Sequence, residues 1–125
     1  MKIILATDSY KGCLTSEEVE NTLAEHLSAK GAEIISMPMS DGGEGMLEAF
    51  ISSIGGEIKE VEVHDPIMRP ITAHYGITSD GTAIIETAKA CGLTLLEPEE
   101  RNPMKTTTYG VGEIIADAVK KNCRK

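Results

Sequence analysis

Aromatic side chains are scarce in this sequence, which contains no tryptophan, one phenylalanine and three tyrosines among its 125 residues. A core built on large aromatic rings is therefore excluded. Hydrophobic residues still make up 41% of the chain and charged residues 26%, a composition typical of globular rather than disordered proteins. We expect about one domain's worth of structure, with a core of isoleucine, leucine, valine, alanine and methionine.

Basic residues are also few. The 12 lysines and arginines are outnumbered by 20 aspartates and glutamates, so the formal net charge is −8 and the pI is about 4.8. Nucleic acids and anionic membranes are bound by clustered lysine and arginine, so neither is expected as a partner. The C-terminal group Lys120, Lys121, Arg124 and Lys125 is interpreted as a cationic last turn that complements a helix dipole.

The cysteines and the apolar runs exclude further classes. Cys13, Cys91 and Cys123 are far apart and lack the spacing of a zinc site or a disulfide framework, which favours a reducing compartment. No segment approaches the ~18 consecutive apolar residues of a membrane span. The N-terminal apolar run leads directly to Asp8 without a signal-peptide pattern. These observations predict a cytoplasmic protein.

The first half of the chain reads as a β-α-β unit. Residues 2–7 and 32–37 are apolar runs typical of buried parallel strands. Between them, Thr15 and Glu18 form a capping-box pattern, and a period of four in the apolar residues predicts an amphipathic helix over 16–29. The connection should be right-handed and the two strands parallel. A further helix is expected over 44–53.

The second half has a different pattern. Residues 57–63 mix charged and β-branched side chains, and residues 71–77 alternate with a period of two, as expected of half-exposed strands. The Asp-Gly pair at 80–81 predicts a tight turn, after which 82–87 returns as a partner strand. Residues 88–96 are expected to begin as a short helix and to end in an irregular apolar segment over 93–96, and a longer helix is expected from 111 onwards. We therefore expect a Rossmann-like start over 1–64, followed over 65–125 by the beginning of a second, mixed or antiparallel α/β domain.

The predicted parallel strands bring two polar loops to one edge of their sheet, where ligands bind in open α/β folds. The first loop carries Asp8, Ser9 and Lys11. The second is the turn Asp41-Gly42-Gly43-Glu44-Gly45, which leads into a helix and offers amides to an anion. Its two acids could hold Mg²⁺, accept a proton from a hydroxyl, or hydrogen-bond a polyol. A simple turn with a helix cap explains this second segment equally well.

Two further positions carry possible chemistry. The hydroxyl run over 106–108 precedes a glycine-rich helix start, so it is interpreted either as an anion site or as ordinary helix capping. Glu86 lies in an apolar segment that reads as a strand. It is either a buried acid that needs a partner or a residue on the solvent face.

Several of these segments occur in an order that resembles the type 1 bacterial glycerate kinase family. They are Asp8-Ser9-Tyr10-Lys11-Gly12, Pro38-Met39-Ser40-Asp41-Gly42-Gly43-Glu44-Gly45, Asp65-Pro66, Asp80-Gly81-Thr82-Ala83-x-x-Glu86-x-Ala88 and Asn102-Pro103-x-x-Thr106-Thr107-Thr108-Tyr109-Gly110-x-Gly112-Glu113. The resemblance covers essentially the whole chain. It departs from the family pattern at Tyr10, where phenylalanine is usual, and at Cys13, where serine is usual.

The resemblance implies an α/β fold in which a second domain is inserted into a Rossmann-like domain. It also implies an ATP- and Mg²⁺-dependent kinase that phosphorylates D-glycerate, at the 2-hydroxyl or alternatively at the 3-hydroxyl. Asp8, Lys11 and Asp41 are the implied catalytic residues, and Asp41 is also a candidate Mg²⁺ ligand. The implied substrate-binding residues are Ser9, Gly42, Gly43, Glu44, Glu86 and Thr107.

Length is the main departure from the family, whose members continue well beyond 125 residues. We therefore expect an incomplete fold with little or no kinase activity alone. Apolar surface that the missing part would cover makes self-association an expected property. The alternatives are a non-catalytic module that binds a small anion or hydroxy-acid, and a structural fragment without a ligand.

Overall fold

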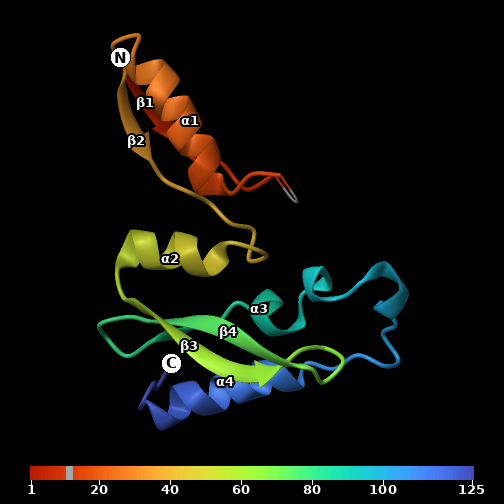
Figure 1. Cartoon of the computed structure of the whole chain (residues 1–125). Coiled ribbons are helices and arrows are strands. Elements are labelled where there is room, and N and C mark those ends of the chain that lie inside the picture. Colours follow the sequence, from red (N-terminus) through yellow and green to blue (C-terminus); the bar gives the residue numbers. More distant parts are fainter. Residues whose placement is uncertain (11–12) are drawn as a thin grey trace. The chain divides into compact units, whose positions relative to one another are not determined.

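The computed structural model describes residues 1–10 and 13–125 (Figure 1). By its internal contacts the chain forms two compact units, Met1–Ala49 and Phe50–Lys125. Within the described ranges, no helix is both long enough and apolar enough to cross a membrane. Each unit has its own sheet, one parallel and one antiparallel.

The first unit is the predicted β-α-β motif. Strand β1 (Lys2–Leu5) pairs in parallel with β2 (Glu33–Ser36), and helix α1 (Ser16–Ser28) connects them. The predicted capping box is present, because the Thr15 side chain accepts from the Glu18 amide while the Glu18 carboxylate accepts from the Thr15 amide. Two otherwise unpaired donors at the helix start are thereby satisfied.

Helix α1 packs on one face of this two-stranded sheet (Figure 1). Leu5 and Val19 are buried between the helix and the strands. The register pairs Ile4 with Ile35, and these two side chains are 60% and 37% exposed. Because successive residues of a strand point to opposite faces, the sheet has one covered face and one open apolar face. Helix α2 (Met46–Ile54) follows and spans the boundary between the units.

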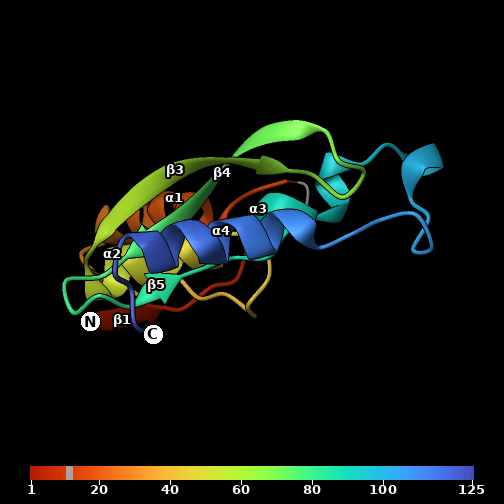
Figure 2. The ribbon, with the colours of Figure 1, turned by 90° about the horizontal axis from the view of Figure 1, so that it is seen from below.

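The second unit is a three-stranded antiparallel sheet with helices. Strands β3 (Glu57–His64), β4 (Pro70–Ile77) and β5 (Ala83–Ile84) pair in the order β3-β4-β5. Helix α3 (Ala88–Cys91) follows β5, and helix α4 (Tyr109–Lys120) lies along one face of the sheet (Figure 2). Two short 3₁₀ segments connect α3 to α4; they are η1 (Leu93–Leu95) and η2 (Pro98–Glu100).

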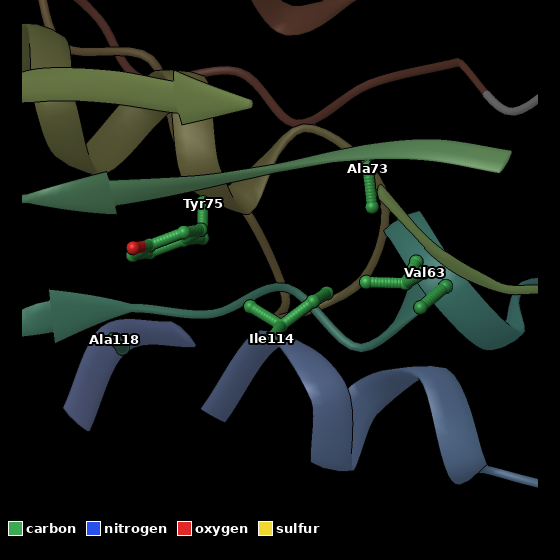
Figure 3. Packing of buried hydrophobic residues seen from close by; sticks show 6 residues of the cluster. Val63, Ala73, Tyr75, Ile114 and Ala118 are labelled. Carbon is green, nitrogen blue, oxygen red and sulfur yellow. The ribbon is translucent and has the colours of Figure 1, made fainter. Parts of the chain in front are cut away.

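The core of the second unit lies between α4, α3 and the sheet. Ile114 and Ala118 of α4 point toward Val63, Ala73 and Tyr75 of the two long strands (Figure 3). The buried Tyr75 hydroxyl donates to the Asp117 carboxylate over 2.8 Å. This satisfies the polar end of a ring that would otherwise be costly to bury.

The short helix expected from residue 88 is confirmed as Ala88–Cys91. Because Gly92 adopts an extended backbone, this helix stops there, and η1 follows in the segment over 93–96 that was expected to be irregular. The partner strand expected over 82–87 pairs only at Ala83–Ile84. By its contacts the chain divides after Ala49, and β3 pairs along its whole length with β4 within the second unit. The domain boundary expected at residue 64 stays a prediction.

Candidate functional site

The two loops that follow β1 and β2 continue side by side beyond the end of the strands. The Met37 amide donates to the Leu5 carbonyl over 2.8 Å, and the Met39 amide donates to the Thr7 carbonyl over 3.0 Å. These bonds extend the parallel alignment of the backbone up to Thr7, the residue before Asp8. The carboxyl edge of the sheet therefore carries both polar loops, which is where a ligand site is expected in an α/β fold.

The first loop carries Asp8 and Ser9. Asp8 is exposed, and one of its carboxylate oxygens accepts from the Ser9 amide over 2.7 Å. The loop closes where the Tyr10 amide donates to the Leu14 carbonyl over 2.8 Å. Lys11, the third predicted catalytic residue, lies outside the described residues.

The second loop is organised by its own side chains. Asp41 Oδ1 accepts from the Gly43 amide over 2.9 Å, and Ser40 Oγ accepts from the Gly42 amide over 3.2 Å. Gly42 and Gly45 have φ of 91° and 85°, a left-handed backbone that favours glycine. A Cβ at position 43 would lie 2.9 Å from Asp41 Oδ1, so a larger residue there would displace the Asp41 side chain.

This arrangement bears directly on anion binding. The amides of Gly42 and Gly43, predicted to bind substrate, already face acceptors from Ser40 and Asp41. An anionic ligand would have to replace or share these acceptors. Glu44 is exposed in the turn that enters α2, where an acid also suits the positive end of a helix dipole.

The other predicted site residues lie in the second unit. Glu86 is only 1% exposed, and it follows β5 in the turn before α3 instead of lying within a strand as expected. The Lys89 ammonium lies 3.9 Å from its carboxylate. The Thr107 hydroxyl oxygen accepts from the Tyr109 amide over 3.1 Å, and the Thr107 amide donates to the Pro66 carbonyl over 2.9 Å. The Thr107 hydroxyl oxygen therefore satisfies the first amide of α4, while the N-cap residue Thr108 makes no side-chain cap bond.

Thr107 also lines a pocket of about 480 Å³ in the second unit. The pocket is bounded by hydroxyl, thiol and apolar groups; its lining residues are Pro66, Cys91, Leu93, Leu96, Pro103, Thr106, Thr107 and Thr108. Burial raises the pKa of the Cys91 thiol, which keeps it protonated and unreactive. The lining favours an uncharged group more than a carboxylate or a phosphate.

Two buried acids were missed by the sequence reasoning. Glu20 of α1 is 1% exposed and accepts from the Thr7 amide and the Ser36 hydroxyl. Its position beside Val19, on the inward face of the helix, is the signal that could have identified it.

The second missed acid is Asp65, which is also 1% exposed. Burial tends to raise the pKa of its carboxyl, but hydrogen bonds from Arg69 and from the Ile67 amide outweigh burial and lower the pKa. Arg69 also contacts Glu100 over 3.2 Å and donates to the Leu95 carbonyl over 2.7 Å. Asp65 therefore organises the connector between β3 and β4, and the Asp-Pro pair was its sequence signal.

The described residues contain no group of three or more histidine, cysteine, aspartate or glutamate side chains arranged to hold a metal ion. Magnesium in phosphoryl-transfer sites is often held by only one or two carboxylates, together with substrate phosphates and water. The exposed Asp41 carboxylate fits that kind of site, so it is retained as the candidate ligand.

Comparison with known proteins adds the family. The profile of the Glycerate kinase family matches residues 3–125. A glycerate kinase from Haemophilus influenzae is 41% identical over 118 residues, which are 92% of this chain and 31% of that protein. A glycerate 2-kinase from Escherichia coli K12 is 40% identical over 95% of this chain and 32% of that protein.

A solved structure agrees with these matches. The crystal structure of a Salmonella typhimurium LT2 protein assigned as glycerate kinase 2 superposes with a TM-score of 0.73 at 37% identity, covering 98% of this chain and 33% of that one. The chain thus spans about a third of the length of its relatives, and its fold is a part of theirs. With the motifs, the paired loops and these matches taken together, the chain belongs to the glycerate kinase family.

Proposed function

We propose that this chain supplies the substrate-binding loops of an ATP- and Mg²⁺-dependent kinase that converts D-glycerate to 2-phosphoglycerate. The observation that carries the proposal is the pairing of the Asp8 loop with the Asp41 loop at one sheet edge in a member of this family. The choice of the 2-hydroxyl is supported by the E. coli relative, which is named a glycerate 2-kinase. The reaction joins the glycerate oxygen to the γ-phosphorus of ATP, releases ADP and frees one proton.

The carboxylates of Asp8 and Asp41 have the roles of orienting the attacking hydroxyl and taking its proton. Catalysis of phosphoryl transfer consists mainly of positioning and charge neutralisation, so weakly basic carboxylates are adequate. We assign Lys11 to the negative charge of the glycerate carboxylate or of the transferred phosphoryl group. Bound Mg²⁺ would neutralise phosphate charge, with Asp41 as its protein ligand.

The remaining contacts follow from the local geometry. The Ser9 hydroxyl and the amides of Gly42 and Gly43 would hydrogen-bond the substrate, with Asp41 releasing the Gly43 amide when the ligand enters. Glu44 would hydrogen-bond a substrate hydroxyl. Glu86 and Thr107 belong to the second unit, and their part in substrate binding stays a prediction.

We also propose that the 125 residues have little or no kinase activity alone, because they correspond to about a third of each relative. The three cysteines are free, which suits a protein that works in the reducing cytoplasm.

A pair of assays tests this proposal. The chain alone, incubated with D-glycerate, ATP and Mg²⁺, should form almost no phosphoglycerate by ³¹P NMR. A chimera in which the chain replaces the matching third of the E. coli glycerate 2-kinase should form 2-phosphoglycerate. In the chimera, Asp41→Asn should lower kcat by about 100-fold or more, while Glu25→Gln on the exposed side of α1 should leave it unchanged.

Each outcome has a clear meaning. Turnover by the chain alone at the rate of the chimera would contradict its incompleteness. Full activity of both the Asp8→Asn and the Asp41→Asn chimeras would contradict the assignment of the site. Formation of 3-phosphoglycerate would correct the hydroxyl, and binding of D-glycerate by the chain without any turnover in the chimera would favour a binding module.

A further inference from the structure

We propose that Glu20 is a positioning residue that holds the Asp8 loop and the Asp41 loop in one fixed arrangement. Its carboxylate lies beneath the edge of the sheet where both loops begin. The inference rests on the proposed function only in that glycerate is taken to bind these two loops; the arrangement itself is a property of the first unit.

The contacts of Glu20 reach both strand ends. Its Oε1 accepts from the Thr7 amide over 2.9 Å and lies 3.3 Å from the Thr7 hydroxyl. Its Oε2 accepts from the Ser36 hydroxyl over 2.5 Å. Thr7 immediately precedes Asp8, and Ser36 is the last residue of β2. One carboxylate therefore joins the two chain segments that leave the sheet.

Thr7 is the residue at which these constraints converge. Its amide and hydroxyl face Glu20, its hydroxyl oxygen also lies 3.4 Å from the Ser16 carbonyl, and its own carbonyl accepts from the Met39 amide. β1 ends at Leu5, so Thr7 is held mainly by these contacts. Without Glu20, the Thr7 amide would lose its acceptor, and the alignment of the two loops would depend on backbone bonds alone.

The burial of Glu20 argues against a role in simple packing. Burying a carboxylate costs free energy unless hydrogen bonds compensate for the lost water, and an apolar side chain of similar size would avoid that cost. The other acids of α1, Glu17, Glu18 and Glu25, are exposed. An inward acid with donors from both strand ends is therefore explained by what it holds in place, and not by the needs of the helix.

The test uses the 125-residue chain and three variants. Glu20→Leu removes both acceptors at similar volume, and Glu20→Gln keeps one oxygen for the Thr7 amide while its own amide can donate to Ser36. Glu25→Leu is the matched control, since Glu25 is an exposed acid of the same helix. The measurements are amide hydrogen exchange by NMR, the Kd for D-glycerate from chemical-shift titration, and the melting temperature.

The Glu20→Leu change should speed exchange of the Thr7 and Met39 amides and weaken D-glycerate binding by roughly tenfold or more, since small misplacements of a binding group have large effects. Glu20→Gln should bind within about threefold of the parent chain, because it retains most of the hydrogen bonds. Glu25→Leu should match the parent in both measurements. If Glu20→Leu does not fold, Ser36→Ala removes only one donor, and it should still speed exchange of the Met39 amide and weaken binding.

Two results would overturn the inference. One is exchange of the Thr7 and Met39 amides at the parent rate in a folded Glu20→Leu or, failing that, in Ser36→Ala. The other is an equal loss of D-glycerate affinity in Glu25→Leu. Absence of D-glycerate binding by the parent chain would count against the proposed function alone, because the exchange rates of these amides still decide the role of Glu20.

Discussion

A methyl group added at Gly110 should destabilise the second unit strongly. A Cβ built at this position would lie 1.9 Å from the His64 carbonyl oxygen at the end of β3 and 3.3 Å from the Ala90 methyl. The first of these is a backbone atom, so no side-chain rotation can relieve the contact. The Gly110→Ala substitution must therefore push α4 away from the sheet and loosen the packing of Ile114 against Val63.

Two effects of opposite sign determine how much Gly110→Ala changes the free energy of unfolding. Replacing glycine by alanine within a helix favours folding by about 1 kcal/mol. Overpacking a close contact typically costs about 1–3 kcal/mol and sometimes more, and the overlap with a backbone oxygen belongs at the upper end of that range. We therefore expect Gly110→Ala to lower the free energy of unfolding by about 2 kcal/mol.

Gly112 provides the matched control on the same helix, because the Cβ that alanine would add there meets no atom within 4 Å beyond its chain neighbours and the helix's own backbone. Gly112→Ala should raise the free energy of unfolding by about 0.5–1 kcal/mol through helix propensity alone. Urea unfolding followed by far-UV circular dichroism compares both variants with the parent chain. A Gly110→Ala protein as stable as the Gly112→Ala protein would refute the packing argument.

Three further predictions concern other parts of the chain. Met68 has a φ of 69°, so Met68→Gly should stabilise the second unit by up to about 1 kcal/mol in urea unfolding; a loss of stability would contradict this. The pKa values of Asp65 and Asp117 are lowered in the folded state, so their stabilising contribution is present above the unfolded pKa near 4 and is lost as pH falls below it. The melting temperature of the parent chain should therefore fall as the pH is lowered below about 4, and it should fall less steeply in Asp65→Asn. An equally steep fall in both proteins would contradict this. The open face with Ile4 and Ile35 should cause concentration-dependent self-association in sedimentation velocity, which Ile35→Thr should reduce; a monomer at all concentrations would contradict that role.

The sequence predicted the first unit well because its signals are local. The capping box at Thr15 and Glu18 and the apolar run before Asp8 each involve residues close together in the chain, and both are confirmed. The local pattern of strand β3 does not say which sheet the strand joins. Only its pairing with β4 in the folded chain decides this.

In the candidate site, too, features with a local sequence signal were predicted, while features that depend on contacts in the folded chain were not. The parallel strands predicted that two polar loops share one sheet edge, and the backbone bond from Met39 to Thr7 is consistent with that pairing. Glu20 was missed because its partners are 13 and 16 residues away and approach it only in the folded chain. Thr107 shows a different limit. A hydroxyl before a helix is read equally as a ligand group or as a cap, and here its oxygen accepts from the Tyr109 amide at the start of α4.

The most direct test of the two-loop site is an NMR titration of the chain with D-glycerate. We predict that the amides whose chemical shifts change include those of Ser9, Gly42 and Gly43. Asp41→Asn should alter the change at Gly43, because the Gly43 amide donates a hydrogen bond to the Asp41 carboxylate in the free protein. Shifts confined to the second unit, with the amides of both loops unmoved at saturating D-glycerate, would contradict the account.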